Sequence, residues 1–158
     1  MTKAKGKVGI SGRVKLTCHK KDGSLKWSTG WMENVITNTG LAEFIKLSGH
    51  NLGGNRFQYL AVGSGTTAED ATQTALANEI SDGGLARAEA TVTSETDTVD
   101  DDTLKLVHSW TATATRTVEE IGFFNDASAG TMGGRKLTGT KEVDEDEVLT
   151  GEYEVVAS

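Results

Sequence analysis

The chain has 158 residues and a formal net charge of −7, with 36% hydrophobic and 25% charged residues, a composition typical of one soluble domain that argues against a membrane-spanning or largely disordered chain. Cys18 is the single cysteine, which excludes an internal disulfide and a multi-cysteine zinc site. The chain has no proline, 19 glycines and 22 threonines. Because threonine is β-branched, these numbers predict many strands, few helices and turns made mostly by glycine.

Charge is divided unevenly along the chain. Residues 1–26 hold eight basic side chains and one acid, a net charge of +7, whereas the other 132 residues hold eight basic and 22 acidic side chains, a net charge of −14. No apolar run of signal-peptide length follows the first lysines, so we expect residence in a reducing cytoplasm. The candidate partner-binding residues are the basic side chains of the first segment: Lys3, Lys5, Lys7, Arg13, Lys15, Lys20 and Lys21.

Two explanations of this basic segment stay open. It contacts an acidic partner, which is either another protein or the acidic body of a neighbouring subunit. Alternatively, its lysines lie on solvent-facing strand positions and discourage edge-to-edge aggregation. Nucleic acid is not an expected partner, because the acidic remainder of the chain would repel a phosphate backbone.

The first 36 residues predict a hairpin. Apolar residues alternate with basic or small ones over residues 8–18, which is typical of a strand with one buried face. Residues 21–24 contain Asp-Gly, a favoured hairpin turn. A second strand is expected over residues 25–36, with a bulge at Gly30.

One helix is predicted over residues 41–48. Leu41, Phe44 and Ile45 recur at the spacing of one helical face, and Gly49 follows as a stop. A helix of about two turns is stable only when it is packed. We therefore expect these three side chains to be largely buried against the sheet.

The rest of the chain is predicted to be strands separated by glycine-rich or acidic turns. A long polar excursion over residues 63–84 has Leu76 and Ile80 as its apolar anchors. The strands expected from alternation or from short apolar runs are residues 56–62, 85–96, 104–115, 118–125, 135–140 and 148–156.

These elements predict an all-β fold, an antiparallel and jelly-roll-like β-sandwich with one short helix. Residues 1–158 form a single β-rich domain with a basic N-terminal arm and hairpin at residues 1–26. Trp110, Ile121 and Phe123 are expected to share its core.

No combination of residues predicts catalysis, so we do not expect an enzyme or a bound cofactor. Residues 63–65 follow a strand, but the lysine of a phosphate-binding loop is missing and Ser64 lies outside a nucleophile-elbow pattern. Cys18 alternates with apolar residues and is expected in the core.

No metal site is expected either. The three histidines, His19, His50 and His108, are spread over different elements. Calcium binding at the acidic residues between Glu95 and Asp102 is the alternative, because hard cations prefer several carboxylates. The region lacks the pattern of an EF-hand loop, and an exposed acidic turn explains the same residues.

Several sequence blocks resemble small virion proteins of tailed bacteriophages. They occur in the same order as in those proteins, over residues 35–156, and Glu69 stands where those proteins have a proline. The matching blocks are YLAVGSGTTA (residues 59–68), TALANEI (74–80), LARA (85–88), VEEIGFFN (118–125), GTM (130–132) and the turn DEVL (146–149) before the last strand.

This resemblance implies a structural protein of the virion, most directly a capsid decoration or cement protein. Such proteins bind the outer surface of the head and stabilise it, often as trimers. The implied partners are the major capsid protein or another virion protein, and further copies of the chain, with no nucleic acid and no membrane. The alternative is a tail-fibre, baseplate or receptor-binding structural module. The implied location is the virion, assembled in the host cytoplasm.

Overall fold

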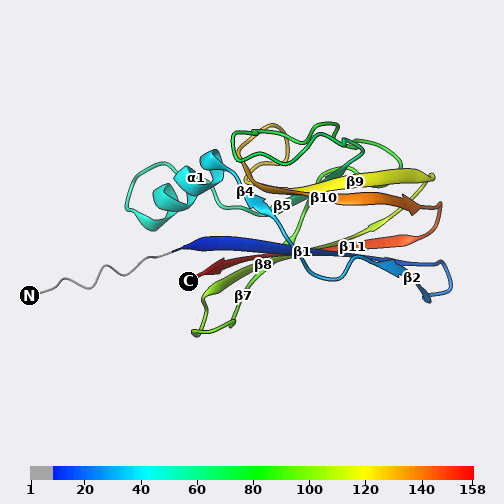
Figure 1. The fold of residues 1–158 in the computed structure, drawn as a ribbon, viewed down its shortest axis with the longest axis horizontal. Helices are drawn as coiled ribbons and strands as arrows, with labels where there is room; N and C mark the ends of the chain where they lie inside the picture. The colour runs from blue at the N-terminus through cyan, green and yellow to red at the C-terminus, as the bar shows by residue number, and fades with distance from the viewer. Residues whose placement is uncertain (1–8) are drawn as a thin grey trace, which may run out of the picture.

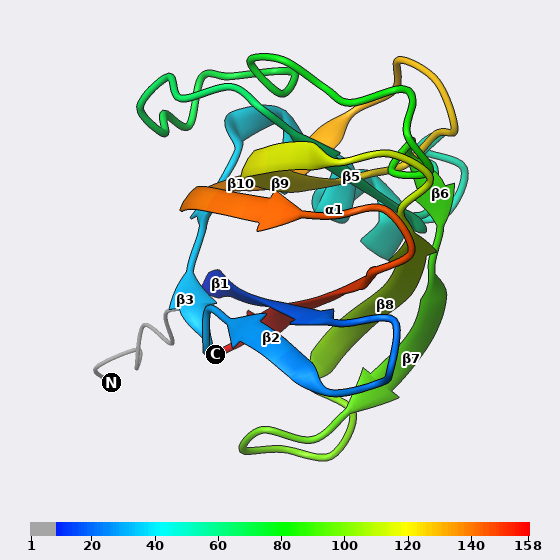
Figure 2. The same ribbon diagram turned by 90° about the vertical axis from the view of Figure 1, so that its right-hand side faces the viewer.

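Two antiparallel β-sheets lie face to face, with one helix at one end, in the computed structural model (Figures 1 and 2). The structure describes residues 9–158. The arrangement confirms the expected antiparallel β-sandwich with one short helix.

The first sheet, sheet A, has the strand order β2-β1-β11-β8-β7. The short strand β3 pairs with the same edge of β1 as β2 does, at Arg13 and Val14. In β1, the even-numbered residues Gly12 to Cys18 face inward, and the odd-numbered residues face solvent. The strands of sheet A are β1 (Ile10–His19), β2 (Leu25–Ser28), β3 (Met32–Glu33), β7 (Thr91–Glu95), β8 (Thr103–Thr111) and β11 (Val148–Ala157).

The second sheet, sheet B, has the strand order β4-β10-β9-β5-β6. The long excursion expected after residue 63 spans residues 64–87 and lies over the outer face of this sheet (Figure 2). The strands of sheet B are β4 (Val35–Ile36), β5 (Tyr59–Gly63), β6 (Ala88–Glu89), β9 (Arg116–Phe124) and β10 (Met132–Val143).

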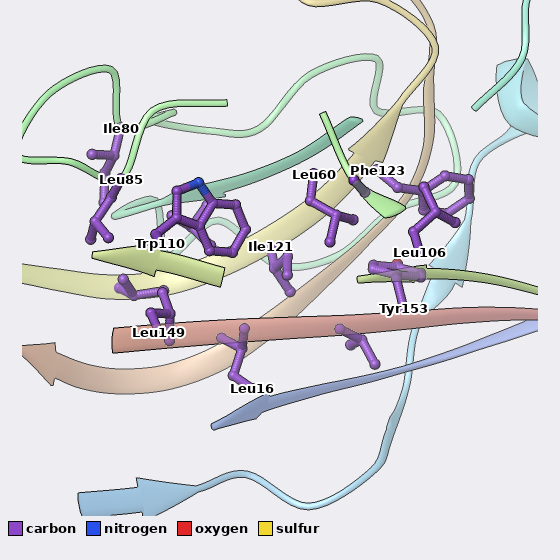
Figure 3. Packing of buried hydrophobic residues seen from close by; sticks show 14 of the residues in the cluster. Leu16, Leu60, Ile80, Leu85, Leu106, Trp110, Ile121, Phe123, Leu149 and Tyr153 are labelled. Atoms are coloured by element: carbon purple, nitrogen blue, oxygen red, sulfur yellow. The ribbon is translucent and has the colours of Figure 1, made fainter. Parts of the chain in front are cut away.

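The core lies between the two sheets and contains Trp110, Ile121 and Phe123, as expected (Figure 3). The Phe123 ring lies 4.6 Å from the Tyr153 ring and 5.0 Å from the Phe57 ring, centroid to centroid. Trp110 Nε1 donates to the carbonyl of Ala86 at 2.8 Å, so its polar atom is satisfied within the core.

Two segments predicted as single strands instead cross from one sheet to the other. Residues 25–36 form β2 and β3 in sheet A and then β4 in sheet B, with the crossing at Asn34. Gly30 has a positive φ of 64° and ends the extended run, so the expectation of one strand with a bulge was wrong. Residues 85–96 divide in the same way, because Ala90 is buried between β6 and β7.

The helix α1 (Asn38–Ser48) has 11 residues and begins three residues earlier than predicted. Thr37 is its N-cap and accepts a hydrogen bond from Gly40 N at 2.9 Å. Among the described residues, no helix has the length and apolar character needed to cross a membrane.

The expectation that Leu41 and Ile45 pack on the sheet was wrong, since they are 41% and 66% exposed. The side of α1 that faces the sandwich carries Gly40 and Glu43. A Cβ at Gly40 would lie 2.4 Å from the carbonyl oxygen of Gly133 in β10, so the helix backbone approaches the sheet through its glycine. Of the three side chains expected in the core, only the partly buried Phe44 packs against it.

Candidate functional site

The basic residues of β1 form ion pairs with their cross-strand neighbours in β11. Arg13 lies opposite Glu154 and Lys15 lies opposite Glu152. Their N–O distances are 2.5 Å and 2.7 Å, and Lys105 of β8 lies 3.6 Å from both carboxylates. The charges along the outer face of sheet A are therefore largely matched within one molecule.

The remaining candidate residues lie at the turn of the first hairpin or outside the described chain. Lys21 Nζ is 2.6 Å from Asp146, between two exposed side chains. Lys20 is exposed and pairs with no carboxylate of residues 9–158. The candidate residues outside the described residues are Lys3, Lys5 and Lys7.

These ion pairs change the interpretation of the uneven charge along the chain. For Arg13, Lys15 and Lys21, the acidic partner is the chain's own body. The prediction that basic residues contact another protein stays open, and it now depends on Lys20 and on the three lysines before residue 9.

Cys18 is buried in the core, as expected, next to two charged side chains of the hairpin end. Its thiol donates to Glu147 at 3.5 Å, and Lys26 Nζ donates to the same carboxylate at 2.8 Å. Burial, assisted by the negative charge of Glu147, raises the pKa of Cys18 to about 12. The thiol therefore stays protonated at neutral pH and lacks the character of a nucleophile.

A buried ion pair on the outer face of sheet B was not anticipated from the sequence. Glu120 of β9 and Arg135 of β10 are 2.7 Å apart, with side chains 0% and 1% exposed. The Glu120 carboxylate also accepts the backbone N–H groups of Gly65, Ala77 and Asn78, at 2.8 to 3.0 Å. This carboxylate therefore fixes two separate parts of the excursion to the sheet.

Arg135 fixes a third part of the excursion. Its Nη1 donates to the carbonyl of Thr67 at 2.8 Å and to Gln73 Oε1 at 3.0 Å. We call Glu120 and Arg135 the sheet B ion pair. Glu120 is adjacent to Glu119 in the sequence and Arg135 to Lys136, so no pattern marks which member of each pair is buried, and the sequence did not reveal this ion pair. The available signal was Gly65, where a Cβ would lie 2.5 Å from the Glu120 carboxylate.

Arg87 connects the end of the excursion to the loop after β9. Its guanidinium lies 3.6 Å from the centroid of the Phe124 ring and pairs with Glu79 at 2.6 Å. Arg87 Nη1 also donates to the carbonyls of Asp126 and Ala129. Arg87 therefore joins the blocks TALANEI, LARA and VEEIGFFN over the outer face of sheet B. The block DEVL lies at the start of β11 in sheet A.

The acidic turn before β8 is organised by hydrogen bonds of its own. Asp102 accepts the backbone N–H groups of Asp97, Val99 and Thr98 at 2.8 to 2.9 Å. These bonds stabilise the carboxylate and hold the pKa of Asp102 well below its usual range. Within residues 9–158, no three His, Cys, Asp or Glu side chains gather in an arrangement that would hold a metal ion.

The comparisons with known proteins add no relative. No family model, curated protein or solved structure matches this chain. The fold is therefore established by the structure itself, and the likeness to phage virion proteins rests on the sequence blocks alone.

Proposed function

We propose that the chain is a structural protein of a tailed-bacteriophage virion, and specifically a capsid decoration protein that binds and stabilises the outer surface of the head. The observation that supports this most is the connection between the resembling sequence blocks. Glu120, in the block VEEIGFFN, accepts hydrogen bonds from Gly65 in the first block and from Ala77 and Asn78 in the second. Three of the resembling blocks thus meet in one folded layer over sheet B, while the block DEVL lies at the start of β11 in sheet A.

The use of buried charge is consistent with a scaffold role. Glu43, 4% exposed, accepts from the backbone N–H of Asn55 at 2.6 Å and from the Asn125 side chain at 3.0 Å. Glu120 and Arg135 hold the excursion in the same manner. Each of these buried ionisable groups fixes a loop to the sandwich, which gives the protein the stable surface loops that a binding protein needs.

Binding to heads tests this proposal directly. Heads prepared without the chain are mixed with increasing amounts of it, sedimented, and heated until they release DNA. The proposal predicts saturable binding at a fixed copy number and a higher release temperature. Tails from the same phage serve as the comparison. Binding to tails and not to heads would favour the tail-fibre or baseplate alternative.

A further inference from the structure

The apolar side of α1 faces solvent. Eight large hydrophobic side chains are exposed among the described residues, and four of them lie within residues 41–52. Leu41 and Ile45 are one helical turn apart and therefore lie on the same side of the helix. Leu47 lies on another side of the helix, two residues after Ile45. We call the other three the α1 patch: Leu41, Ile45 and Leu52.

The α1 patch is held in place from beneath. Thr37 caps the helix and Gly40 contacts β10. Glu43 accepts hydrogen bonds from Asn55, within the loop after α1, and from Asn125, which directly follows β9. Leu52 folds back over Gly49, where a Cβ would lie 2.3 Å from the leucine side chain. The helix cannot turn its apolar side inward without breaking these contacts, so the exposure is built into the fold.

The apolar surface continues from the helix into a groove at the same end of the sandwich. Phe44, next to Leu41 on the helix surface, forms the apolar part of its wall together with Ile10, Leu104 and Val155. Asp101 and Asp102 line its other side. The groove has a volume of about 320 Å³. Monomeric proteins rarely leave a contiguous apolar surface of this kind uncovered, and such surfaces commonly mark a protein interface.

The charge of the surface indicates which partner covers it. Residues 38–55 contain one acid, Glu43, and one lysine, Lys46, and these two pair with each other at 3.3 Å. The segment is therefore close to neutral in a chain of net charge −7. Two copies of an acidic molecule repel one another least when they meet through a neutral, apolar surface.

We propose that the α1 patch is the surface through which copies of this chain associate, with α1 of one copy packed against α1 of the next. The inference rests on the exposed side chains and on the charge of the chain, and does not depend on the proposed role in a virion. A helix of 11 residues is about 16 Å long. A standard interface buries about 800 Å² per partner, so we expect the contact to extend beyond the helix onto the apolar wall of the groove at Phe44.

Sedimentation of matched variants tests the proposal. Ile45→Glu places a charge in the α1 patch, whereas Leu25→Glu places the same charge on β2, at the opposite end of the sandwich (Figure 1). The two side chains are similarly exposed, at 66% and 59%. Wild type and Leu25→Glu should show the same concentration-dependent mass between micromolar and millimolar protein. Ile45→Glu should associate roughly 30-fold more weakly or worse.

A second readout places the contact on the surface. Cys18 is buried and has a raised pKa, so a cysteine introduced by Ile45→Cys is the only reactive thiol in the folded chain. Its rate of reaction with a maleimide should fall as protein concentration rises. The rate for Leu25→Cys should not change.

Three results would overturn the proposal. The first is a wild-type chain that stays monomeric at every concentration. The second is an Ile45→Glu mass equal to that of the wild type, and the third is equal dissociation of both glutamate variants. If Ile45→Glu does not fold, as judged by circular dichroism, then Leu52→Glu, at 54% exposure, takes its place with the same expected weakening.

Discussion

Phe123 connects the aromatic residues at the centre of the core. Its ring contacts those of Tyr153 and Phe57, and Phe44 of α1 lies 6.4 Å away, so the same side chain links both sheets and the helix. Phe123→Ala should lower the free energy of unfolding by roughly 3–5 kcal/mol, measured by urea denaturation. Val99→Ala, at a 67% exposed position, is the control and should change it by less than about 0.5 kcal/mol. A small loss at Phe123 would mean that the core is not packed as described.

Asp102 makes the turn between β7 and β8 sensitive to acid. Its pKa is lower in the folded chain than the ordinary aspartate value of about 3.9, so the stability that it adds is fully present above that pH and is lost as the pH falls below it. The amide resonances of Thr98 and Val99, followed by NMR, should therefore titrate below the ordinary value. Asp102→Asn should remove this transition, and Asp100→Asn should keep it. Titration at the ordinary aspartate pKa would contradict the hydrogen-bond arrangement.

At the scale of elements, the sheet B ion pair holds the excursion of residues 64–87. Glu120→Gln leaves Arg135 as a buried charge without its partner, which should cost roughly 3–5 kcal/mol of stability. Hydrogen exchange should also accelerate at the backbone amides that donate hydrogen bonds to Glu120, those of Gly65, Ala77 and Asn78. Unchanged protection at these three amides would show that the carboxylate does not hold the loop.

Two further variants distinguish this buried ion pair from a surface ion pair and from a buried pair that apolar residues can replace. Asp82→Asn breaks a surface pair with Arg116 and should leave the unfolding midpoint nearly unchanged. Replacing both Glu120 and Arg135 by methionine removes the buried charges but leaves three backbone N–H groups without an acceptor. The double variant should therefore remain destabilised, unlike buried ion pairs that tolerate apolar replacement.

The elements differ in how far the sequence predicted them. Alternation located the long strands of both sheets, because a face buried along a whole strand leaves a period of two. The crossings at Asn34 and Ala90 were missed, since extended residues keep the same local pattern when they pass from one sheet to the other. For α1 the helical period was correct and the buried side was wrong. The close contact of Gly40 with Gly133 determines which side of the helix is buried, and the hydrophobic pattern of the sequence carries no information about that contact.

The candidate partner-binding residues were predictable as a charged segment but not as an arrangement. Net charge showed that residues 1–26 oppose the rest of the chain. It did not show that Arg13 and Lys15 face glutamates, because the pairing of β1 with β11 joins residues more than 130 positions apart. The two residues of the sheet B ion pair are only 15 positions apart, in adjacent strands, but their burial depends on the excursion, whose amides lie 42 to 55 positions from Glu120.

For the whole molecule, the candidate basic residues that no described ion pair uses are the exposed Lys20 and the three lysines that lie outside residues 9–158. Deleting residues 1–7 removes Lys3, Lys5 and Lys7 and changes the net charge from −7 to −10. We expect lower occupancy on heads at low salt, with the difference closing as salt screens the attraction. Lys15→Gln is the control, since Lys15 already pairs with Glu152. Equal occupancy of the truncated and full chains at every salt concentration would leave the lysines a solubilising role only.

Electron microscopy of virions assembled with and without this chain tests the proposed function most directly. The account predicts added density in regular positions on the outer surface of the head, absent from virions that lack the chain. It also predicts that the added density has the shape of the two-sheet sandwich. Heads that look identical in the two preparations, with the chain found on the tail or missing from the particle, would contradict it.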